Sequence, residues 1–80
     1  MLANNNSNVP NEAVTACVYD ENQSGVWLLF TKNLPEFVPD IDKQAYSQTL
    51  NYMNTYSSMR SNIHRFFDAL KAGHSQGLTM

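Results

Sequence analysis

The feature that most constrains this chain is the stretch from Ile41 to Ala72, which contains neither proline nor glycine. These two residues are the usual breakers of helices, so one uninterrupted helix is permitted along the whole stretch. Asp40 suits the N-cap position before it, and Gly73 follows where helices commonly end. We therefore predict a single helix about 48 Å long, at 1.5 Å per residue.

Apolar residues follow this helix in a heptad seam, because the steps between them alternate between four and three positions. The seam consists of Ala45, Thr49, Tyr52, Tyr56, Met59, Ile63, Phe66 and Leu70. The flank beside it is apolar in the first half of the helix (Tyr46, Leu50, Met53) and basic in the second half (Arg60, His64, Lys71). The apolar surface of the helix is therefore wide in the first half, which predicts a docking site for the rest of the chain. It is narrow in the second half, which predicts a seam that stays exposed.

Two short runs before the helix are rich in β-branched and aromatic residues, at positions 13–19 and 26–31. The turn-forming residues 20–25 separate them, which predicts a β-hairpin. Alternation along the second strand places Val26, Leu28 and Phe30 on one face. Trp27 and Leu29 lie on the other face, so both faces are apolar and both need cover.

The segment 33–39 carries Pro35 and Pro39, which we expect to end the hairpin and stiffen the link to the helix. Its apolar residues, Leu34, Phe37 and Val38, are expected to fold back on the core. The predicted fold is therefore α+β, an N-terminal β-hairpin packed on one long C-terminal amphipathic helix. The alternative is a ββαα chain whose helix breaks near Ser57 and Ser58; the unslipped seam favours the continuous helix.

The chain has 80 residues, which makes one domain. We expect a loosely ordered tail at 1–11, a single domain at 12–73 and a flexible tail at 74–80. A chain of this size usually needs a further source of stability, and a single cysteine allows no disulfide within the chain. A second subunit is the remaining source, so we predict a homodimer.

The predicted interface is the second half of the helix, where a hairpin strand of about 23 Å could not reach, at about 3.3 Å per residue. Apolar side chains left open there form a patch that a lone chain seldom exposes. The candidate interaction residues are Tyr56, Met59, Ile63, Phe66, Phe67 and Leu70.

Charge and hydropathy restrict the partners. The net charge of −2 is unlike that of a general polyanion binder. No apolar run of about 18 residues exists, and the first residues lack the pattern of a signal peptide. We therefore expect a cytoplasmic protein that does not enter a membrane.

A search for catalytic chemistry gives little. The chain has no glycine-rich phosphate loop, no nucleophile elbow, and no cluster of cysteine and histidine with metal-ligand spacing. Cys17 on a predicted strand is better explained as a core residue than as a nucleophile. We expect neither enzymatic activity nor a metal or cofactor.

The expected function is therefore a non-catalytic protein–protein interaction, as a stoichiometric inhibitor or adaptor. Small chains of this kind are common among accessory proteins of phages and mobile elements. The alternative is a dimeric DNA-binding regulator that uses the basic flank, Arg60, His64 and Lys71, which could also contact an acidic partner.

Overall fold

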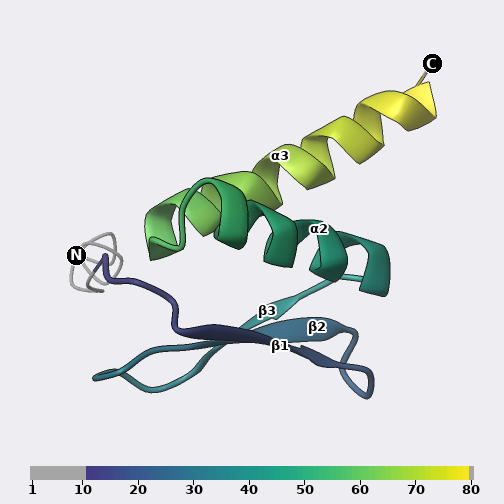
Figure 1. Cartoon of the computed structure of the whole chain (residues 1–80). Coiled ribbons are helices and arrows are strands. Elements are labelled where there is room, and N and C mark those ends of the chain that lie inside the picture. Colours follow the sequence, from purple (N-terminus) through teal and green to yellow (C-terminus); the bar gives the residue numbers. More distant parts are fainter. Residues whose placement is uncertain (1–10, 80) are drawn as a thin grey trace, which may run out of the picture.

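The computed structural model describes residues 11–79, with side chains as far as Gly73. Three strands are followed by two helices, so the chain is α+β as predicted. The strands form one antiparallel sheet in the order β1-β2-β3, and both helices lie on the same face of it (Figure 1). The predicted tail at 1–11 lies outside the described residues except for Asn11.

The predicted hairpin is confirmed. β1 (Ala16–Asp20) pairs with β2 (Gly25–Leu29), and the register sets Cys17 opposite Leu28. The turn is held by the Asp20 carboxylate, which accepts a hydrogen bond from the backbone N–H of Gln23 at 3.1 Å.

A third strand was not predicted. β3 (Glu36–Pro39) pairs with β2, although prolines stand just before it and at its end. Proline is tolerated there because β3 is an edge strand and needs hydrogen bonds on one side only. β3 passes so close to Gly25 that a β-carbon on that residue would collide with the carbonyl oxygen of Val38 and the ring of Phe37.

The prediction of one continuous helix is wrong, and the alternative break is confirmed. α2 (Lys43–Thr55) ends with Tyr56 as its C-cap, and α3 (Arg60–Thr79) then folds back beside it. The backbone released at the break is bonded elsewhere: the carbonyl of Ser58 accepts from the N–H of Val14 at 2.8 Å. A continuous helix would use that carbonyl itself.

Further hydrogen bonds fix the start of α3. The N–H of Arg60 donates to the carbonyl of Glu12 at 3.0 Å. The side chain of Asn11 accepts from the N–H of Ser61 at 2.9 Å, and the Ser57 hydroxyl accepts from the N–H of Met59 at 3.1 Å. Such side chains compete with helix bonds for the backbone, and here they satisfy the first N–H groups of α3.

The predicted helix ends also change. Asp42, not Asp40, is the N-cap of α2, and its carboxylate accepts from the N–H of Ala45 at 2.8 Å. Asp40 has φ 62° and turns the chain between β3 and α2. Gly73 does not end the last helix, because α3 continues to Thr79. That residues 74–80 form a flexible tail stays a prediction.

The core lies between the sheet and the helices. Val26 and Leu28 are fully buried, as their predicted face required. The complete buried apolar set is Val14, Cys17, Val26, Leu28, Val38, Ile41, Ile63 and Phe67. Tyr46, Leu50 and Met53 of α2 pack against it, which confirms that the first half of the predicted helix belongs to the core. Neither helix is long and apolar enough to cross a membrane, over the residues that the structure describes.

Candidate interaction surface

The predicted open seam is largely closed. Ile63 is 0% and Phe67 is 2% exposed, so the expectation that they stay uncovered in a single chain is wrong. The reason is the helix break, which turns α3 back so that its apolar side chains meet the sheet. A long straight helix would have held the same residues beyond the reach of the strands.

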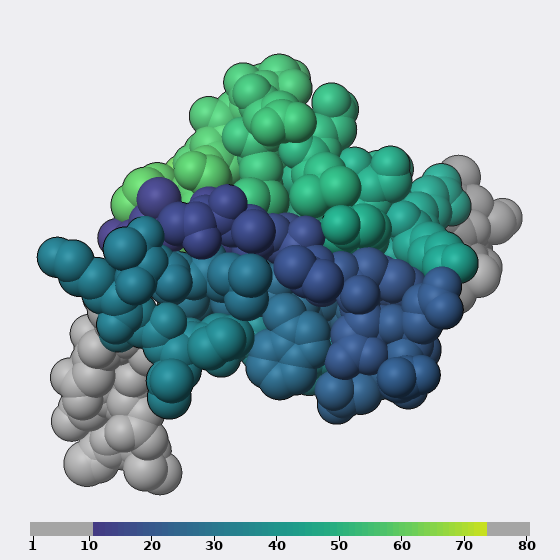
Figure 2. Space-filling model, turned by 60° about the horizontal axis from the view of Figure 1, so that its bottom comes forward, coloured from purple at the N-terminus to yellow at the C-terminus, as the bar shows by residue number. Residues whose placement is uncertain are grey.

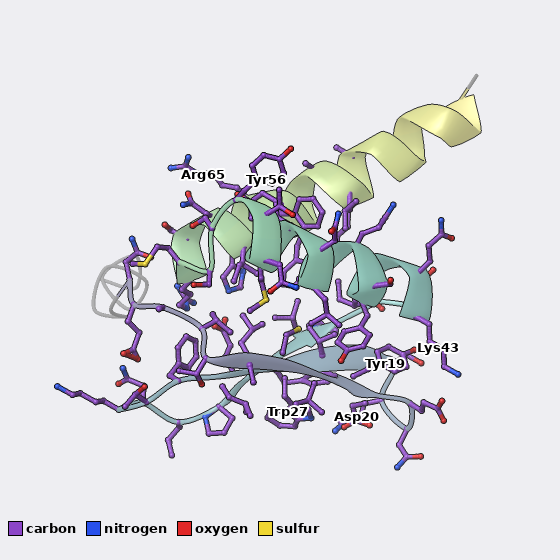
Figure 3. All side chains as sticks on the ribbon, in the orientation of Figure 1. Tyr19, Asp20, Trp27, Lys43, Tyr56 and Arg65 are labelled. Atoms are coloured by element: carbon purple, nitrogen blue, oxygen red, sulfur yellow. The ribbon has the colours of Figure 1, made fainter. Side chains whose placement is uncertain are left out.

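The other predicted interaction residues differ in their placement. Phe66 stacks on Tyr52, with ring centroids 4.5 Å apart and 13° between the planes. Met59 is half-buried in the break, where it pairs with Ala13 in an isolated β-bridge. Tyr56 is 77% exposed, and Figure 3 shows it beside Arg65 on the side away from the sheet. Leu70 is half-buried.

The basic flank is mostly occupied by the chain itself. Arg60 donates to both carboxylate oxygens of Glu36, at 2.8 and 3.0 Å. His64 Nε2 lies 3.0 Å from Glu36 Oε2, which is within ion-pair distance, but the angle between the two groups does not suit a hydrogen bond. Burial acts to raise the pKa of Glu36, but its contacts with Arg60 and His64 prevail and hold that pKa below its usual value of 4.5.

This cluster argues against the basic flank as a binding site for nucleic acid. The carboxylate neutralises the guanidinium charge locally and occupies two of its N–H groups, which makes Arg60 a poor site for a phosphate. Arg60 is only 22% exposed in its side chain, which limits it further. Within the basic flank, Lys71 is the residue that forms no ion pair with another described residue. Three free charges along one helix face are therefore not present.

The face of the sheet opposite the helices is apolar. The register places Val18, Trp27 and Phe37 side by side across the three strands. Leu29 and Pro39 share this face by the alternation of side chains. Figure 2 shows the strands, blue to teal, with no green helix atoms lying over them. We call this surface, made of Val18, Trp27, Leu29, Phe37 and Pro39, the outer sheet face.

An aromatic pair forms the centre of the outer sheet face. The rings of Trp27 and Phe37 are 5.1 Å apart and tilted by 52°. The indole Nε1 donates to Asp20 at 3.0 Å, and Gln23 donates to the same carboxylate oxygen at 2.9 Å. The bond from Trp27, more than those from Gln23, lowers the pKa of Asp20. Figure 3 shows Trp27 and Asp20 together on the side away from the helices.

The two edges of the sheet are less open to a partner than its face. On β1, the hydroxyl of Tyr46 donates to the carbonyl oxygen of Cys17 at 3.2 Å, and the Tyr46 ring packs on Tyr19. On the β3 side, Pro35 and Pro39 have no N–H to offer a further strand. Natural sheets use such features against edge-to-edge pairing. A partner would therefore meet the face rather than extend the sheet.

Part of this surface could be read from the sequence. Alternation in the second strand already placed Trp27 and Leu29 away from the core, on a face that needed cover. Phe37 was assigned to the core, because the third strand was not recognised. Val18, which is 46% exposed, was not singled out, although its position opposite Trp27 follows once the hairpin register is known.

Cys17, the nucleophile considered from the sequence, lies in the core and not on this surface. Cys17 is buried, and desolvation raises the pKa of its thiol to about 11, so that the thiolate is scarce at neutral pH. Among the described residues, no three histidine, cysteine or acidic side chains come together as metal ligands. Comparison of the chain with family models, curated proteins and solved structures finds no significant match.

Proposed function

We propose that this protein is a stoichiometric inhibitor or adaptor that binds another protein through the outer sheet face. The observation that carries the proposal is the Trp27–Phe37 pair, held in place at the centre of an apolar face that the described helices leave uncovered. Aromatic side chains in such positions commonly supply most of the binding free energy of an interface. Their fixed geometry lowers the entropy lost on binding.

The chemistry of the face favours a largely apolar partner surface. Its carboxylate, Asp20, accepts hydrogen bonds from Trp27 and Gln23, which hold it at the border of the apolar side chains. Three strands about 4.8 Å apart are about 14 Å wide, and an α-helix with its side chains is about 10–12 Å across. The occupant that fits is the apolar stripe of one amphipathic helix, covering this face as α2 and α3 cover the other.

The size of the face sets the strength of the interaction. Strands of about five residues give it an area of about 240 Å², against about 800 Å² per partner in a stable complex. A single face therefore gives a reversible complex rather than a permanent one.

The test is affinity capture with the full chain from its source cell, comparing variants. Val18→Lys places a charge on the outer sheet face at a position that is already 46% exposed. Tyr56→Lys is the matched control, because Tyr56 is 77% exposed on the helical side. We expect a partner in stoichiometric amount with the wild type and the control, and its loss with Val18→Lys.

The purified partner then allows a direct measurement. Trp27 is the only tryptophan, so its emission should shift when the outer sheet face is covered. A partner that binds Val18→Lys as well as wild type but fails to bind Tyr56→Lys would move the binding surface to the helices and overturn the proposal.

A further inference from the structure

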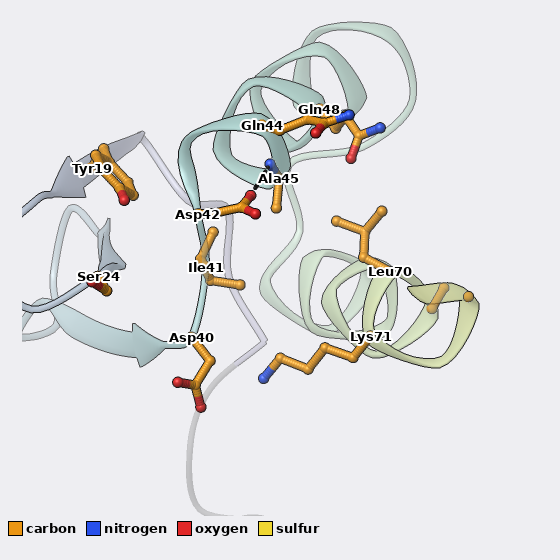
Figure 4. Close-up of a pocket in the computed structure, with 12 residues that line it drawn as sticks. Tyr19, Ser24, Asp40, Ile41, Asp42, Gln44, Ala45, Gln48, Leu70 and Lys71 are labelled. Atoms are coloured by element: carbon orange, nitrogen blue, oxygen red, sulfur yellow. Dashed lines mark hydrogen bonds between the residues drawn. The ribbon is translucent and has the colours of Figure 1, made fainter. Parts of the chain in front are cut away.

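A groove lies on the helical side of the molecule, between the start of α2 and the second half of α3 (Figure 4). Its volume is about 750 Å³. The floor is apolar, with Ile41 only 2% exposed and with Ala45 and Leu70 half-buried beside it. Exposing an apolar surface of this kind to water costs free energy, which is recovered when another surface covers it.

Opposite charges stand on the two sides of the groove. Asp40 lies at the end of β3, and Lys71 lies across from it on α3 (Figure 4). Neither forms an ion pair with a described residue. Asp42, the other carboxylate here, is used by the backbone of α2 as its N-cap. The groove therefore offers one anion and one cation to an occupant.

The helix that borders the groove diverges from α2 along its second half. α2 has 13 residues and α3 has 20, which gives lengths of about 20 and 30 Å. Figure 1 shows α3 rising away from α2 and projecting past the sheet. A helical segment of a few turns is marginal in water without a packing surface. A partner that fills the groove would also support this segment.

We propose that the occupant is a second copy of this chain, whose α3 lies antiparallel against the first α3 in the groove. A two-fold axis near Leu70 makes the interface self-complementary, so that each contact occurs twice. Lys71 of each copy then meets Asp40 of the other, and the two unpaired charges become two ion pairs. The apolar floor of each groove is covered by Leu70 of the other copy.

This dimer differs from the one expected from the sequence, since Ile63 and Phe67 remain in the core of each chain. It also goes beyond the proposed function, because the groove and the outer sheet face lie on different sides of the molecule. Two outer sheet faces would point outward from one dimer. Two faces that bind weakly can then act together, and linked sites gain affinity without new contacts.

The test is sedimentation equilibrium of the full chain at about 1–100 µM, with charge-swapped variants. We expect a dimer for the wild type. Lys71→Glu and Asp40→Lys should each raise its dissociation constant about five- to tenfold, since each replaces two attractive pairs by repulsive ones. The double variant restores attraction with the signs exchanged, and it should recover most of the lost affinity.

A second measurement does not depend on the rescue. Leu70→Cys places one thiol per copy near the proposed axis, while the native Cys17 is buried. Mild oxidation should give a disulfide-linked dimer, and Asn54→Cys, exposed on α2 and outside the lining of the groove, is the comparison that should link more slowly. Circular dichroism checks that each variant is folded. A monomeric wild type would overturn the proposal, and so would a dimer that ignores both single swaps and does not link through position 70.

Discussion

Trp27 and Phe37 pack ring to ring across the β2–β3 pair, on the face of the sheet that lies away from the helices. The contact joins the predicted hairpin to the strand that was not predicted. It also brings the indole N–H to Asp20, so that one side chain links all three strands. Removal of the Trp27 side chain should therefore reduce both the stability of the chain and its affinity for a partner.

Trp27→Ala should lower the free energy of unfolding by about 2 kcal/mol, less than the 3–5 kcal/mol of a fully buried tryptophan because Trp27 is partly exposed. Urea unfolding followed by circular dichroism measures this. Trp27→Phe keeps the aromatic packing but loses the bond to Asp20, and it should cost about 1 kcal/mol. Equal losses for the two variants would show that the ring contact contributes little.

Gly25→Ala should destabilise the chain by about 2–3 kcal/mol, because the added carbon meets the backbone of β3, which cannot move without breaking its pairing with β2. Gly73→Ala is the matched control. It adds the same group to an open position on α3 and should stabilise by about 0.5–1 kcal/mol. Thermal unfolding of both variants should therefore give shifts of opposite sign.

Stability should depend on pH through Glu36. Its pKa in the folded chain is lowered below 4.5, so its contribution is complete above that value and is lost as the pH falls through the folded pKa. Urea midpoints measured between pH 2 and 6 should fall towards the acid end. Glu36→Gln should reduce this dependence and cost about 1–2 kcal/mol at neutral pH, because Arg60 keeps its charge without its partner.

Glu21→Gln is the control for that titration, since Glu21 pairs with Lys43 in solvent, where such a pair contributes little. An unchanged pH profile in Glu36→Gln, with a flattened one in Glu21→Gln, would contradict the assignment.

Ser57→Ala should cost about 1 kcal/mol, because the hydroxyl accepts from the N–H of Met59 and from the amide of Asn62 at the break. Ser47→Ala, exposed within α2, removes a hydroxyl where alanine is the better helix former and should be neutral or slightly stabilising. Chemical unfolding measures the free energy of both variants. Equal values would show that the Ser57 hydroxyl does not stabilise the break.

Local pattern was enough to predict the hairpin, the inner residues Val26 and Leu28, and the attachment of the first half of the helical stretch to the core. It could not predict β3, because Pro35 and Pro39 argue against a strand unless its place at an edge is known. Nor could it predict the break, since the heptad seam passes through Tyr56 without a slip.

The break depends on residues far away in the chain. The seam included Ile63 but not Phe67, and it did not indicate what covers either side chain. Ile63 and Phe67 meet strands of the same chain once the helix turns back, and no spacing within the helix carries that information. The candidate surface was seen only in part for the same reason, because Phe37 joins Trp27 through long-range pairing.

The segment from Asn11 to Val14, which bonds to the backbone at the break, also bears on how the chain folds. Its contact with α3 joins Asn11 to Ser61, 50 positions apart, so this segment must meet the start of α3 before the helical hairpin is complete. Contacts of such separation close slowly, and folding rates fall as they become more important. The turn between α2 and α3 should therefore form late, and it should lose its structure together with the segment from Asn11 to Val14 when the protein unfolds.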